Sequence, residues 1–80
     1  SDAKQQLNNI VSQIEALAQD VDDDRTDIAE AIIAVKEELN AERIRTTPLR
    51  LAFNAIKGAI SGLVDTGIEK LAEQAIKLLQ

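Results

Sequence analysis

The chain of 80 residues contains no cysteine, histidine, methionine, tryptophan or tyrosine. Without cysteine or histidine it cannot form a disulfide, a thiolate nucleophile, an imidazole base or an ordinary zinc site. Its serines have no histidine to activate them, and the adjacent Glu37 and Glu38 would point in different directions on a helix instead of facing each other across a cleft. These absences predict a protein that is not an enzyme and that uses no metal or other cofactor.

Long apolar runs are also missing. No uncharged stretch approaches the roughly 20 residues of a membrane-spanning helix, and the chain does not open on a basic-then-apolar signal segment. The sequence therefore predicts a cytoplasmic protein with no membrane span. Position 1 is serine and not methionine, which favours a fragment of a longer protein. The net charge of −5 and the lack of tryptophan and tyrosine argue against nucleic acid as a partner.

The residues that are abundant favour helices. Hydrophobic residues make up 45% of the chain and charged residues 29%, which is a composition typical of a folded globular domain. Alanine, leucine, glutamate, glutamine and lysine dominate, and the aromatic residues that favour strands are nearly absent. We therefore expect an all-α fold in which residues 1–80 form a single helical domain.

Apolar residues at spacings of three and four predict the first helices. They place helices at about residues 2–20 and 25–42, joined by an acidic turn, so that the two form a helical hairpin. Thr47 followed by Pro48 predicts the start of a third helix, at about 48–64, because threonine caps a helix well and proline is tolerated at the first helical position.

The apolar pattern changes phase after this third segment. On a helical wheel, the apolar face of residues 67–79 is displaced by about one residue from that of 48–64. Thr66 and Glu69 fit a capping box, which marks a helix start. We therefore expect a break or kink near Asp65–Gly67 and a small helical bundle of three to four helices. The alternative is one continuous helix whose second half pairs with a symmetry mate.

Charge is unevenly distributed between the predicted helices. The acidic stretch from Asp20 does not match a calcium loop, because Arg25 stands where that loop needs glycine and Ala31 where it needs glutamate. A basic stretch follows the second helix, so the acidic turn of one copy could dock on the basic connector of another. The residues of this docking hypothesis are Asp22, Asp23, Asp24, Arg43, Arg45 and Arg50.

Small residues form a strip beside the apolar stripe of residues 48–64. Such a strip lets two helix backbones approach closely, whether the second helix belongs to the same chain or to another. Together with the apolar stripe and two leucines from the last helix, the strip forms a predicted interaction surface. Its residues are Ala52, Phe53, Ala55, Ile56, Ala59, Ile60, Gly62, Leu63, Leu71 and Leu78.

Several short segments of residues 31–80 carry a resemblance to a known class of protein. They are the Lys-Glu-Glu-Leu run at 36–39, the Thr47-Pro48 restart, the Ile-Lys-Gly segment at 56–58, the Ser-Gly pair at 61–62 and the aliphatic final helix. This pattern resembles the helical C-terminal tails of prokaryotic abortive-infection (anti-phage) and prophage-associated proteins. The resemblance implies a bacterial or phage setting and a tail used for assembly or partner binding.

These observations predict a non-catalytic module for oligomerisation or protein interaction within a larger bacterial or phage protein. Its expected partner is a second copy or another helical protein, because a chain of this length buries only about 60% of its unfolded surface. One alternative is an acidic regulator that covers a basic protein surface with residues 20–30. Another is a membrane-surface protein that uses the amphipathic helix at 48–64.

Overall fold

The structure, a computed structural model, describes residues 2–19, 26–60 and 67–80. Within these ranges the chain forms helices and contains no strand, which confirms the predicted all-α class. The helices are α1 (Asp2–Ala18), α2 (Thr26–Leu39), α3 (Thr46–Ile60) and α4 (Ile68–Leu78).

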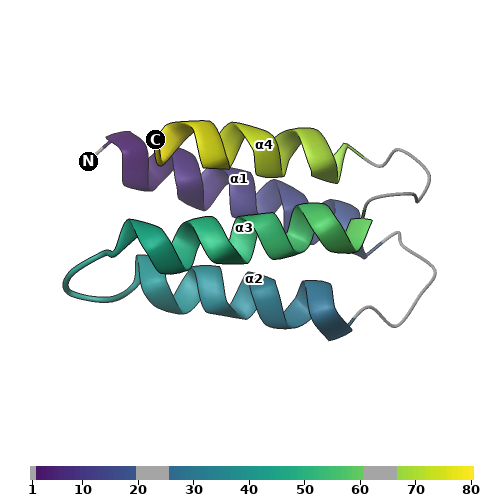
Figure 1. The fold of residues 1–80 in the computed structure, drawn as a ribbon, viewed down its shortest axis with the longest axis horizontal. Helices are drawn as coiled ribbons and strands as arrows, with labels where there is room; N and C mark the ends of the chain where they lie inside the picture. The colour runs from purple at the N-terminus through teal and green to yellow at the C-terminus, as the bar shows by residue number, and fades with distance from the viewer. Residues whose placement is uncertain (1, 20–25, 61–66) are drawn as a thin grey trace.

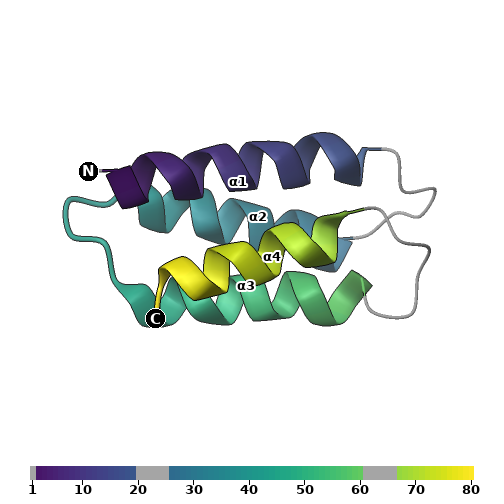
Figure 2. The same cartoon turned by 90° about the horizontal axis from the view of Figure 1, so that it is seen from above.

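The helices form an up-and-down bundle (Figure 1). Each helix packs beside the next one in sequence, and α4 returns to pack beside α1. Viewed from above, α1 and α4 lie toward the viewer, and α4 crosses in front of α3 (Figure 2). The beginning of α1, the end of α4 and the connection from α2 to α3 all lie at the same end of the bundle.

The core is built from one face of every helix. Its members recur at spacings of three and four, so each helix turns a single apolar face inward. Phe53 is the largest fully buried side chain among the described residues, and Ile14, Val35 and Ile56 are equally covered. The core residues are Leu7, Ile10, Val11, Ile14, Ile28, Ala31, Ile32, Val35, Leu39, Leu49, Ala52, Phe53, Ile56, Ile60, Ile68, Ala72 and Ala75.

The end of α2 and the beginning of α3 differ from the predicted positions, which were residues 42 and 48. The second helix already ends at Leu39, where the Asn40 N–H donates to the Lys36 carbonyl oxygen at 3.1 Å. The third helix begins at Thr46, so Pro48 lies inside its first turn. Proline is tolerated there because the N–H groups of a first turn have no carbonyl partner within the helix.

The predicted break between the last two helices is confirmed. The third helix ends at Ile60 and the fourth begins at Ile68, while Asp65 and Thr66 lie outside the described residues. The cap is Gly67, with a left-handed φ of 86° and no side-chain hydrogen bond. The expected capping box begins at Thr66 and so lies outside the described residues. The N-cap of α4 is Gly67, and glycine adopts this backbone shape at little cost.

An ion pair joins the first two helices. Lys36 Nζ donates to both carboxylate oxygens of Glu15, at 2.8 and 2.7 Å. Both side chains remain nearly half exposed. A pair in this setting contributes little to stability, because water and salt screen it. The apolar core, and not this pair, therefore holds α1 against α2.

Candidate protein-interaction surface

Three large apolar side chains stand out on the surface of the described chain: Leu51, Ile33 and Leu78, with 66%, 55% and 39% of their area exposed. Single exposed apolar residues are common in soluble proteins and by themselves indicate nothing. Their surroundings decide whether they mark a site. Leu51 and Leu78 each line a groove between two helices, whereas Ile33 does not line either of these two grooves.

The first groove lies between α2 and α3, and we call it the α2–α3 groove. Small alanine side chains face each other across it, so the two helices lie close together and leave a shallow, open depression along the seam. Leu51 and Pro48 provide its larger apolar surface, and two acids stand toward the beginning of α2. Its lining residues are Asp27, Glu30, Ala31, Ala34, Pro48, Leu51, Ala52 and Ala55.

The acids of this groove differ in what they do for the fold. Asp27 Oδ1 accepts a hydrogen bond from the Ile28 N–H at 2.8 Å, so this carboxylate supports the start of α2. Glu30 and Glu37 are exposed and lie two turns apart, on the same side of the helix. The exposed side of α2 therefore carries acids in the groove lining, at Asp27 and Glu30, and again at Glu37, about one turn beyond the lining.

Glu38, near the end of α2, is joined to Arg45 in the connection that leads to α3. Glu38 is a buried carboxylate, and it accepts the Arg45 backbone N–H at 3.0 Å and the Arg45 Nη2 at 3.1 Å. These hydrogen bonds from Arg45 hold the pKa of the Glu38 carboxyl below its ordinary value of 4.5. The contact fixes the connection between α2 and α3. Arg45, predicted as a docking residue, is thus paired within its own chain.

This contact predicts a loss of stability in acid. Because the folded pKa of Glu38 is below 4.5, its contribution is fully present above that pH and is lost as the pH falls through the lowered value. We expect Glu38→Gln to lower the urea midpoint at pH 7 and to differ less from the parent chain at pH 3. Urea titrations followed by circular dichroism at both pH values measure this. The control Glu37→Gln, at an exposed neighbour, should leave the midpoint unchanged at pH 7; a loss as large as that of Glu38→Gln would contradict the assignment.

Of the other predicted docking residues, the structure describes Arg50 and Arg43. Arg50 Nη2 donates to the Leu79 carbonyl oxygen at 3.4 Å, which turns this cation toward the end of α4. Its Nε is buried and has no hydrogen-bond partner among the described residues. Arg43 is exposed. Asp22, Asp23 and Asp24 lie outside the described residues. The predicted docking between copies therefore stays a prediction, because its acidic half lies outside the described residues.

The predicted apolar interaction surface is largely occupied by the fold itself. Ala52, Phe53, Ile56 and Ile60 are buried in the core, so none of them is available to a partner while the bundle is closed. Of the small-residue strip, Ala52 and Ala55 line the groove beside α2, and Ala59 packs against the core. A helical wheel shows which face of a helix is apolar but does not show which other helix covers that face. For this reason, residues predicted to contact a partner are found in the core of their own chain.

The other residues of that predicted surface have mixed positions. Ala59 and Leu71 are half-buried against the core, whereas Ala55 and Leu78 are exposed. Gly62 and Leu63 lie outside the described residues. Leu51 was not predicted, although the sequence contains a signal for it. It is a large apolar residue that departs from the inward phase set by Leu49 and Phe53, two residues to either side.

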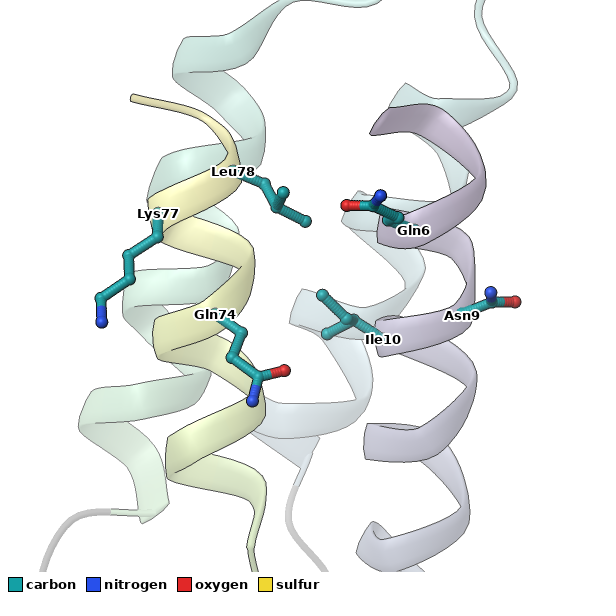
Figure 3. Close-up of a pocket in the computed structure, with 6 residues that line it drawn as sticks. All are labelled: Gln6, Asn9, Ile10, Gln74, Lys77 and Leu78. Carbon is teal, nitrogen blue, oxygen red and sulfur yellow. The ribbon is translucent and has the colours of Figure 1, made fainter. Parts of the chain in front are cut away.

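A second groove lies between α1 and α4 and is shown in Figure 3. Leu78 points across this groove toward Gln6 and Ile10, whereas Lys77 and Asn9 point away from it. The lining is apolar and amide-rich, and no carboxylate lines it. Leu78 thus covers part of its own bundle. The two grooves differ mainly in charge, since only the α2–α3 groove has acids in its lining.

Metal-binding clusters, membrane-spanning helices and similarity to known proteins were also considered. Among the described residues, no group of three or more acids forms a metal-binding cluster. None of the described helices has the length and apolar character needed to cross a membrane. Searches with the chain found no matching family model, no matching curated protein and no matching solved structure.

Proposed function

We propose that this chain is a non-catalytic protein-interaction module and that the α2–α3 groove is its contact surface. The observation that carries the proposal is the exposure of Leu51, at 66%, on the edge of a groove lined with alanine. A large apolar side chain beside an open apolar groove offers a partner an anchor and a complementary surface.

The energetics of Leu51 support a role outside the fold. Covering a leucine side chain stabilises a protein or a complex by roughly 1.5–3 kcal/mol. In the free bundle most of this gain is absent, because α3 packs through its opposite face, where Phe53 and Ile56 are fully buried. A partner that covers Leu51 would recover it.

The same burial weakens one of the alternatives. The membrane-surface interpretation needs the apolar stripe of residues 48–64 to face lipid, but within α3 that stripe forms the core. The acidic-regulator interpretation keeps its support, because acids border the groove at Asp27 and Glu30. A place in a bacterial phage-defence protein stays a proposal that follows from the sequence resemblance.

Leu51→Gln tests the proposed surface. We expect the free energy of unfolding to change by less than about 0.5 kcal/mol, because the side chain is mostly exposed and glutamine is a good helix former. We also expect contact through the groove to be lost. The probe is a neutral amphipathic helical peptide of leucine and glutamine, titrated into the isotope-labelled chain and followed by amide NMR, with solution mass measured by light scattering.

Ile33→Gln is the matched control, since Ile33 is also an exposed apolar residue but does not line the groove. In the parent chain and in the control, amide shifts should gather on α2 and α3, or the chain should self-associate. Both effects should disappear in Leu51→Gln. A parent chain that stays monomeric and shows no shifts on α2 and α3 would overturn the proposal.

A further inference from the structure

We infer that the partner of the α2–α3 groove is a cationic amphipathic α-helix, with an apolar residue against Leu51 and lysine or arginine over the acids of α2. This inference rests on the proposed function and names the chemistry of the partner. It follows from the shape of the groove, from the charges along it and from the poor match between two copies of the same surface.

The shape of the groove fits a helix. Its lining runs over residues 27–34 of α2 and 48–55 of α3, which is about two turns, or roughly 10 Å, along each helix. Two packed antiparallel helices with small residues along their seam leave a linear depression, and the apolar face of a third helix can lie in such a depression. Leu51 stands on one border of it and the α2 acids on the other.

The charges on the exposed side of α2 are negative. Glu30 and Glu37 are both exposed there. Lys36, the nearest cation on this helix, is engaged with Glu15 on the side of α1. Near the end of α2, Arg45 is engaged with the buried Glu38. A partner with cations on the flank that faces α2 would therefore meet acids, and this complementarity selects its charge.

A second copy of this chain matches the groove less well. Two copies that meet through this face bring the same acids together. The whole chain also carries a net charge of −5, so two copies repel each other at low salt. Charge therefore favours a basic partner over self-association.

Three helical peptides of equal length test this inference. Each has the same leucine face, and the other positions are lysine, glutamine or glutamate. Titrated into the labelled full chain at low salt, the lysine peptide should bind at least about tenfold more tightly than the glutamine peptide, and the glutamate peptide should bind least. Its shifts should lie on α2 and α3 and not along the α1–α4 groove. Added salt should reduce the difference between the peptides.

Variants of the chain locate the effect. Glu30→Lys combined with Glu37→Lys should weaken the lysine peptide by about tenfold. Leu51→Gln should weaken all three peptides, because it removes the apolar anchor without changing charge. The control is Asp2→Lys combined with Glu69→Lys, which changes the net charge equally at exposed acids of α1 and α4, and it should stay within about twofold of the parent chain. Circular dichroism confirms that each variant is folded.

The possible failures are distinguishable. Equal binding of the three peptides, abolished by Leu51→Gln, would overturn the cationic partner and leave the proposed function standing. Self-association that requires Leu51, without peptide binding, would name a second copy as the partner instead. If the lysine peptide still binds the Glu30→Lys/Glu37→Lys variant and the Leu51→Gln variant, its binding reflects general attraction to an acidic chain. That result would also overturn the inference. No contact of any kind at α2 and α3 would overturn both proposals.

Discussion

Replacing Phe53 with alanine should remove a large part of the free energy that holds the bundle folded. The side chain has no exposed surface and is the largest fully buried one among the described residues, so its removal leaves a large cavity in the core. Such a change costs about 3–5 kcal/mol, whereas a chain of 80 residues has a total stability of roughly 4–12 kcal/mol. Urea unfolding followed by circular dichroism at 222 nm measures the loss.

Leu51→Ala is the matched control for this substitution. It shortens an apolar side chain in the same helix, two residues away, but at a position that is 66% exposed. Its cost should stay below about 0.5 kcal/mol, since alanine is the best helix former and little packing is lost. If the two variants lost equal stability, the assignment of one face of α3 to the core and the other to contact would be wrong.

The two described glycines should respond in opposite directions to alanine. Gly67→Ala should lower the free energy of unfolding by about 1–2 kcal/mol, because residue 67 holds a left-handed φ of 86° that disfavours a Cβ. Gly58→Ala should raise it by up to about 1 kcal/mol, because Gly58 lies inside α3 and a Cβ there meets no atom within 4 Å. Thermal and urea unfolding of the two variants measure both changes.

A third variant separates backbone strain from crowding at the start of α4. A Cβ on Gly67 would lie 3.6 Å from Leu17 Cδ1, which is an ordinary contact, so lack of space is not the cause of the expected loss. Gly67→Asn should therefore destabilise less than Gly67→Ala, since asparagine tolerates the left-handed conformation despite its larger side chain. The reverse order would indicate crowding.

The helical pattern could be predicted from the sequence because each helix buries one face. The spacing of Leu7, Ile10, Val11 and Ile14 determines which side of α1 turns inward, and the phase change near Gly67 marks where α3 could not continue. The early end of α2 could not be predicted in this way. It depends on the contact between Glu38 and Arg45, which forms only when the connection folds back.

The candidate surface was less predictable than the fold. Apolar residues of α3 that looked available in the sequence, such as Phe53 and Ile56, are covered by the other helices, and this depends on how four faces assemble. Leu51 is the converse case: it departs from the apolar phase, and only the packed structure shows that it lies beside alanines of α2. Arg45 and Arg50 likewise acquire their partners through tertiary contacts.

The position of the chain ends sets how the bundle would respond to a pulling force. The beginning of α1 and the end of α4 lie at the same end of the bundle, and the two helices pack side by side. Tension applied through these ends would separate α1 from α4 one turn at a time, starting near Leu78. The force then acts on one pair of helix turns at a time and not on the whole contact between the helices. Such a geometry gives way at low force, whereas tension applied at opposite ends would have to slide whole helices past each other.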